Sequence, residues 1–241
     1  YPEYVVLCQA ARRTGRAVRW MSGRMEAMLS DNAGRDLISR ARLAFDDGLR
    51  ILGYRVETVA NLGAYNSQFG QPIQSELFSK VLTGVYDIPA AHLRVRGVYT
   101  NTTQVDAYRG AGRPEAIHVL ERCMDEAARV LGTDPFALRR SNFITRFPHA
   151  SATGEVIDSG DFGLVLDRAA AAADVAGFDA RRAGSARAGR LRGLGLCCYV
   201  EAILGDPTET ARLCFAPDGT VALHVGTQSN GQGHETAFRQ M

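Results

Sequence analysis

The alternation of apolar and polar positions predicts two strands near the start of the chain, at residues 36–45 and 49–62. An Asp-Asp-Gly sequence at positions 46–48 separates them. A short turn of this composition between two alternating segments is typical of a β-hairpin. We therefore expect an antiparallel pair of strands here.

Further strands are expected later in the chain. Alternating or continuous apolar segments lie at residues 93–105 and 191–200. Residues 210–215 and 220–225 alternate in the same way, and a Pro-Asp-Gly turn at 217–219 joins them. These last two segments predict a second hairpin.

Apolar residues three or four positions apart predict the helices. The clearest spans residues 113–131, because Pro114 suits the first turn of a helix and Gly132 its end. Asp134 and Asp161 are expected to cap two more helices, which end near residues 140 and 176. The remaining helical segments are predicted at residues 3–13, 77–85 and 235–241.

Strands and helices come in blocks rather than in strict alternation, which predicts an α+β fold with mixed sheets and flanking helices. Residues 181–190 are rich in Arg, Ala and Gly, and this composition indicates an exposed linker. We expect a first subdomain at 1–180 and the start of a second at 191–241. The chain opens without Met, and its last predicted helix reaches the final residue. These two features predict a piece of a longer polypeptide.

Composition narrows the functional classes. A net charge of +2 provides no strong field for nucleic acid or membranes. No apolar run approaches the roughly 18 residues of a membrane span. The five cysteines are odd in number and include no CxxC pair. They predict buried thiols in a reducing cytoplasm rather than disulfides or a zinc site.

Two glycine-rich turns are the candidates for chemistry. Residues 226–236 read Gly-Thr-Gln-Ser-Asn-Gly-Gln-Gly-His-Glu-Thr, after the last predicted strand. Residues 106–114 read Asp-Ala-Tyr-Arg-Gly-Ala-Gly-Arg-Pro, before the clearest helix. Glycine lets a ligand lie against backbone N–H groups, and a helix N-terminus favours an anion such as pyrophosphate. A structural turn explains each segment equally well on its residues alone.

Two alternatives stay open at this point. Gly231 and Gly233 after a strand are similar to a dinucleotide-binding turn, although Thr236 stands where the third glycine belongs. A Rossmann-like nucleotide-binding module is therefore one alternative. A non-catalytic phosphate-binding domain is the other, and acidic residues that balance the basic ones weaken it. The fourth residue after His234 is Phe238, so a zinc-protease helix is excluded, and we expect no metal ligands in this chain.

Together the two turns resemble those of the large, molybdenum-binding subunit of the xanthine oxidase family of molybdenum hydroxylases. Within it, the chain is most similar to carbon monoxide dehydrogenase-like large subunits. Residues 107–115 match the family's active-site loop, and residues 226–236 match its cofactor loop. The segments at 61–63, 86–89 and 138–142 fit in order and spacing. The likeness covers essentially the whole chain.

The resemblance implies the fold, the activity and the partners. The fold would be the α+β molybdenum-cofactor-binding domain of a much longer oxidoreductase subunit. That subunit would hydroxylate an aldehyde or N-heterocycle with water as the oxygen source. The cofactor would be molybdopterin cytosine dinucleotide with molybdenum. Iron–sulfur and FAD subunits would be the partners of the large subunit. An earlier cofactor loop and a catalytic glutamate would lie outside this chain, so the isolated chain is expected to be inactive and free of cofactor.

The resemblance also implies roles for single residues. Gln232 would donate its amide to a molybdenum oxygen or to the pterin, and Arg109 would approach the molybdenum from the other loop. Tyr199 and Glu201, in the segment 199–208, would line the substrate pocket. The expected cofactor contacts are Gly110, Ala111, Gly226, Thr227, Gly231, Gln232 and Gly233.

One position departs from part of the family. Enzymes of this family that oxidise carbon monoxide at a Mo–Cu centre carry a cysteine where this chain has Gly110. Copper(I) needs a soft thiolate ligand, which glycine lacks. The sequence therefore predicts an organic substrate rather than carbon monoxide.

Overall fold

The computed structural model describes residues 2–202, 208–229 and 231–241. The chain divides into two compact units, residues 1–201 and 202–241. Helices and small sheets are mixed within it, so the predicted α+β class is confirmed.

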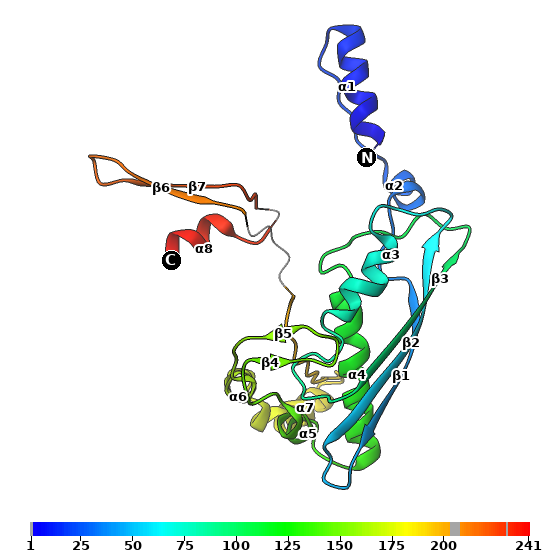
Figure 1. Ribbon diagram of the computed structural model, residues 1–241, viewed down its shortest axis with the longest axis vertical. Helices are drawn as coiled ribbons and strands as arrows, with labels where there is room; N and C mark the ends of the chain where they lie inside the picture. The colour runs from blue at the N-terminus through cyan, green and yellow to red at the C-terminus, as the bar shows by residue number, and fades with distance from the viewer. Residues whose placement is uncertain (1, 203–207, 230) are drawn as a thin grey trace. The chain divides into compact units, whose positions relative to one another are not determined.

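A three-stranded sheet of order β1-β2-β3 is the centre of the first unit (Figure 1). β1 (Leu37–Phe45) pairs antiparallel with β2 (Ile51–Gly63), which confirms the predicted hairpin. β3 (Ala91–Tyr99) runs parallel to β2 along its other edge. The predicted third strand was too long, because pairing stops at Tyr99 and resumes only in an isolated bridge between Val105 and Ala33.

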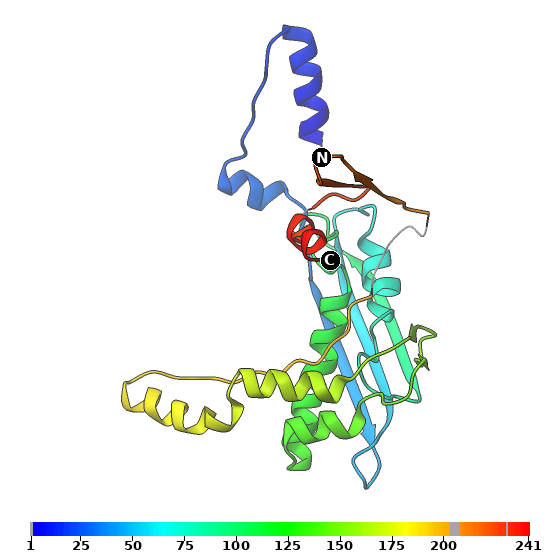
Figure 2. The same ribbon diagram turned by 90° about the vertical axis from the view of Figure 1, so that its left-hand side faces the viewer.

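Helix α4 (Arg113–Leu131) lies along one face of this sheet (Figures 1 and 2). Its buried residues include Ala116, Leu120, Met124 and Ala128, which are four positions apart and form one apolar stripe. Gly132 ends the helix in the left-handed conformation, with φ of 64°. Both predicted ends of this helix are confirmed.

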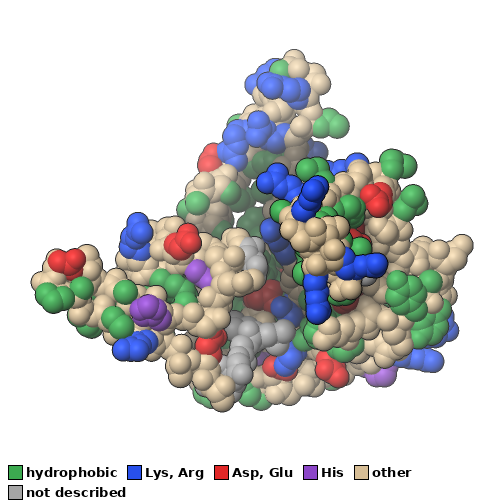
Figure 3. Space-filling model, turned by 90° about the horizontal axis from the view of Figure 1, so that it is seen from above, with side chains coloured by type: hydrophobic (Ala, Val, Ile, Leu, Met, Phe, Trp, Pro, Cys, Tyr) green, Lys and Arg blue, Asp and Glu red, His purple; other side chains and the backbone are tan. Residues whose placement is uncertain are grey.

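The opposite face of the sheet is exposed and basic. Glu57 lies there opposite Arg40 and Arg94 in the strand register. Hydrogen bonding and charge from Arg55, with the charges of neighbouring arginines, lower the pKa of Glu57. On the wider surface, charged and hydrophobic side chains lie among one another (Figure 3). The exposed arginines of this face are Arg40, Arg42, Arg55, Arg94 and Arg96.

Shorter elements complete the first unit. Asp134 and Asp161 cap their helices as predicted, since their carboxylates accept hydrogen bonds from the amides of Ala137 and Leu164. The elements are α1 (Pro2–Thr14), α2 (Arg24–Ser30), α3 (Gly70–Pro72), the π-helical turn η1 (Ile73–Leu77), α5 (Pro135–Asn142), β4 (His149–Ala150), β5 (Val156–Ile157), α6 (Phe162–Ala172), the 3-10 turn η2 (Val175–Gly177) and α7 (Phe178–Arg187).

Two local predictions were wrong, and one segment holds more regular structure than expected. The helix predicted at 77–85 lies earlier, at residues 70–79, and turns follow it at residues 80–85, where Gly84 has a φ of 54°. Most of the expected linker at 181–190 belongs to α7, because Ala and Arg favour helix even on a largely exposed segment. Residues 191–200 form no strand. The division of the chain into subdomains at this point stays a prediction.

The cysteines are less buried than predicted. All five are free thiols; Cys8 and Cys197 are exposed, and Cys123, Cys198 and Cys214 are partly buried. In the described ranges, no cluster of His, Cys, Asp and Glu could hold a metal ion. None of the helices in those ranges has both the length and the apolar character that a bilayer crossing needs.

The second unit is a hairpin followed by a short helix. β6 (Ala211–Phe215) pairs antiparallel with β7 (Val221–Val225), as predicted. α8 (His234–Gln240) follows the glycine-rich turn, also as predicted. Most described side chains of this unit are exposed.

Candidate functional site

The turn before α4 has an unusual backbone. Gly110, Ala111 and Gly112 have successive positive φ angles of 88°, 38° and 91°. A Cβ atom on Gly110 would overlap the Pro114 ring, and one on Gly112 would overlap the backbone of Ile73. In this chain a side chain at either position would therefore strain the backbone and overlap a neighbour.

The amides of this turn are bonded within the protein. Ala111 N donates to the Tyr108 carbonyl at 2.7 Å, and Arg113 N donates to the Gly110 carbonyl at 3.1 Å. Gly112 N donates to Glu115 Oε2 at 3.0 Å, and the Glu115 side chain is buried. We expected this turn to offer its backbone N–H groups to an anion. For these three amides that expectation was wrong, because protein oxygens already accept from them.

The turn presents side chains instead. Tyr108 is 59% exposed, and Arg109 is also exposed. Arg113 forms an ion pair with Glu201, a contact that joins the turn to the segment expected to line the substrate pocket. Tyr199, in the same segment, borders a small apolar cavity of about 130 Å³. The rest of that segment, at positions 203–207, lies outside the described residues.

A buried polar network fixes the chain just before Tyr199. Glu121 is 5% exposed, and its carboxylate accepts hydrogen bonds from Arg139 Nε at 3.0 Å and from the amide of Cys198 at 2.8 Å. The hydroxyl of Tyr86 donates to the same carboxylate. At Cys198 the backbone N–H thus bonds a side chain of α4 and not a neighbouring strand. Burial and the charge of Glu121 raise the pKa of the Cys198 thiol to about 12.

The second candidate turn lies between β7 and α8, in the second unit. It holds Gly226, Thr227, Gly231, Gln232 and Gly233, while Asn230 lies outside the described residues. Gly231 and Gly233 have positive φ angles of 112° and 74°. The side chains of Thr227 and Gln232 are exposed.

Two features of this turn fit a polar cofactor. A Cβ atom on Gly233 would meet nothing within 4 Å, so the backbone there is open to a close ligand. His234 stacks on Phe238 at 5.1 Å, and its buried Nδ1 has no hydrogen-bond partner among the described atoms. An unsatisfied buried nitrogen beside open backbone suits a ligand that hydrogen-bonds.

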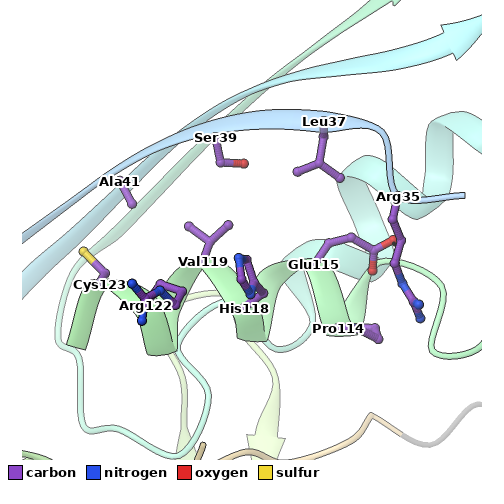
Figure 4. Close-up of a pocket in the computed structure, with 10 residues that line it drawn as sticks. All are labelled: Arg35, Leu37, Ser39, Ala41, Pro114, Glu115, His118, Val119, Arg122 and Cys123. Atoms are coloured by element: carbon purple, nitrogen blue, oxygen red, sulfur yellow. Dashed lines mark ion pairs between the residues drawn. The ribbon is translucent and has the colours of Figure 1, made fainter. Parts of the chain in front are cut away.

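A groove that the sequence did not predict lies next to the first turn. It has a volume of about 770 Å³ and runs between β1 and α4 (Figure 4). Arg35 and Glu115 stand at its end near the turn. Glu115 had a sequence signal, since an acid three residues into a helix often bonds back to the cap. Arg35 had none, because its contacts depend on the tertiary fold.

Comparison with known proteins covers both units. Residues 1–143 and residues 168–241 each match a family described as a molybdopterin cofactor-binding domain. The carbon monoxide dehydrogenase large chain of Hydrogenophaga pseudoflava is 31% identical over 100% of this chain and 32% of its own length. The nicotine 6-hydroxylase large subunit of Paenarthrobacter nicotinovorans is 30% identical over 100% of this chain and 31% of its own length.

Solved structures agree with the sequence matches. Quinoline 2-oxidoreductase from Pseudomonas putida 86 superposes with a TM-score of 0.84 at 30% identity, over 100% of this chain and 32% of that chain. The chain spans about a third of the length of these relatives. It belongs to the molybdopterin cofactor-binding domain family.

Proposed function

We propose that this chain is the cofactor-holding part of the large subunit of a molybdenum hydroxylase. The whole enzyme would hydroxylate an aldehyde or N-heterocycle with water as the oxygen source. The observation that carries this proposal is likeness over the full chain to large subunits of oxidoreductases, with both glycine turns included. A match in fold alone would not establish the function of this chain.

The cofactor would be molybdopterin in its cytosine dinucleotide form, and when bound it would supply the molybdenum redox chemistry. Gln232 would hold it through its side-chain amide, with Thr227, Gly231 and the open backbone at Gly233 beside it. Gly226 would complete this turn. The contribution of the protein is position and hydrogen bonding.

The first turn would act through different atoms. Arg109 would direct its exposed guanidinium toward the cofactor, and Gly110 would allow close approach. The amide of Ala111 is already bonded to Tyr108, so its contact would come from the methyl group or the carbonyl.

An N-heterocycle is the substrate class that we favour. Two of the relatives are named for nicotine and for quinoline, both of which are N-heterocycles. The exposed ring of Tyr199 could stack on such a substrate, and Glu201 could accept a hydrogen bond from it. Carbon monoxide is disfavoured, because Gly110 provides no thiolate for copper.

Iron–sulfur and FAD subunits would accept the electrons. Two of the relatives are named as a large chain and a large subunit, which supports a multi-subunit assembly. We also propose that these 241 residues alone turn over no substrate, since they correspond to about a third of each relative.

Isotope labelling tests this function. The full-length assembly is supplied with quinoline, nicotine and an aromatic aldehyde in ¹⁸O-labelled water, with a dye as electron acceptor. We expect ¹⁸O in the hydroxylated product, detected by mass spectrometry. Dye reduction with none of these substrates, or product oxygen that comes from O₂, would contradict the proposal.

A further inference from the structure

Arg35 has a strained backbone held by its neighbours. Its φ angle is 58°, in the left-handed region that residues other than glycine rarely adopt. On one side, Ala33 N donates to the Gln104 carbonyl at 3.0 Å. On the other side, the Asn61 amide donates to the Asp36 carbonyl at 2.9 Å. Strain that the surrounding structure maintains in this way often accompanies function.

The Arg35 side chain contacts the turn before α4 at two points and the first turn of α4 at a third. Its guanidinium lies 4.6 Å from the centroid of the Tyr108 ring, and Nη2 donates a hydrogen bond to the Arg109 carbonyl. Its Nε lies 3.8 Å from Glu115 Oε1, and Figure 4 shows the two side chains side by side. The other oxygen of Glu115 accepts from the Gly112 amide. One guanidinium is therefore linked to a ring, a carbonyl and, through Glu115, an amide of the same turn.

The backbone next to Arg35 packs against the turn 106–113. A Cβ atom on Gly34 would lie 2.9 Å from the Cβ of Tyr108, so Gly34 packs directly against it. Asp106 N donates to the Ala33 carbonyl at 2.9 Å, which fixes the beginning of the turn. The segment 33–35 thus holds the turn through its backbone and through one side chain.

We propose that Arg35 is a positioning residue that holds the turn 106–113 in the conformation in which Arg109 and Gly110 face the molybdenum cofactor. This role rests on the proposed function, because it assumes that the turn faces the cofactor. Arginine suits the task, since its planar guanidinium can stack on a ring and hydrogen-bond in its own plane at once. A lysine ammonium is a point charge that could keep the ion pair with Glu115 but not all three contacts.

Hydrogen exchange of the full-length assembly tests this role without relying on activity. Peptides that cover residues 106–115 are compared in the unaltered protein and in Arg35→Ala, Arg35→Lys and Arg40→Ala. Arg40 is the matched control, because it is an exposed arginine of β1 on the opposite face of the sheet. We expect exchange in this turn to rise about tenfold in Arg35→Ala, the effect of losing one hydrogen bond to a charged group. Arg35→Lys should lie in between and Arg40→Ala should not differ.

The variant Glu115→Gln extends the hydrogen-exchange experiment to the partner of Arg35. Glutamine can still accept from the Gly112 amide but cannot pair with the Arg35 charge. If both residues act on one turn, Arg35→Ala combined with Glu115→Gln should speed exchange less than the product of the single effects. Effects that multiply independently would contradict a shared role.

Measuring kcat and melting temperature of the molybdenum-loaded holoenzyme distinguishes a positioning role of Arg35 from a role in folding. We expect a lower kcat in Arg35→Ala, partial rescue in Arg35→Lys, and an unchanged melting temperature in both. Unchanged exchange in Arg35→Ala together with normal turnover would overturn the role of Arg35 and leave the proposed function intact. Faster exchange in Arg35→Ala, in an assembly whose unaltered form binds no molybdenum, would instead overturn the proposed function and the cofactor-facing role together.

Discussion

At the scale of single residues, replacing Gly110 tests most directly whether the turn before α4 can accept a side chain. Gly110→Ala should lower the free energy of unfolding by about 1–3 kcal/mol for backbone strain, with a further loss from overlap with the Pro114 ring. Gly154 is the matched control, because its φ is also 88° and a Cβ atom there would meet nothing within 4 Å. Urea unfolding of both variants measures the difference. Equal losses would show that the turn can rearrange around a side chain.

Substitution of Gln232 should lower activity without lowering stability. Gln232 is exposed, so Gln232→Ala should leave the urea midpoint of the full-length assembly nearly unchanged. Loss of one oriented donor at a reacting centre typically lowers the rate by about 10²–10³. The comparison uses kcat per bound molybdenum, so that poor loading is not mistaken for poor catalysis. Unaltered turnover per molybdenum would show that Gln232 is only a turn residue.

At the scale of elements, the network of Glu121 ties α4, α5 and the segment before Tyr199 together. Arg139 is fully buried, and its partners are Glu121 and Asp125. Glu121→Ala should lower the free energy of unfolding by about 3 kcal/mol, the lower end of the cost of breaking a buried pair, because Asp125 remains. It should also speed exchange of the Cys198 amide. Glu126→Ala, which removes an exposed pair on the same helix, should have a much smaller effect. Equal effects of the two substitutions would contradict a structural role for the network.

The elements also show what the sequence could predict. Both hairpins, α4, the caps at Asp134 and Asp161, and α8 follow from local periodicity and turn residues. Residues 191–200 could not be assigned in this way, because the backbone N–H of Cys198 bonds a side chain of α4 and not a neighbouring strand. Likewise, Arg35 was missed because its three contacts lie 73 to 80 residues further along the chain. Both glycine turns were found from the sequence, but the hydrogen bonds that the amides of the turn before α4 make within the protein were not.

At the scale of the whole molecule, the absence of a side chain at Gly110 predicts that the full-length assembly lacks copper. Copper beside molybdenum needs a thiolate from the turn at 106–113, and that turn contains no cysteine. We therefore expect the full-length assembly to contain no copper and to oxidise no carbon monoxide. Elemental analysis by mass spectrometry and a carbon monoxide assay check both. Carbon monoxide turnover with copper equimolar to molybdenum would refute this interpretation of Gly110.

We expect the whole protein to hold a molybdopterin cofactor. The most direct test is cofactor analysis of the purified full-length assembly, with molybdenum measured by mass spectrometry and the released pterin and nucleotide identified by chromatography. We expect molybdenum equimolar with the large subunit, together with molybdopterin and cytosine monophosphate. An assembly that hydroxylates its substrate without molybdenum or pterin would contradict it.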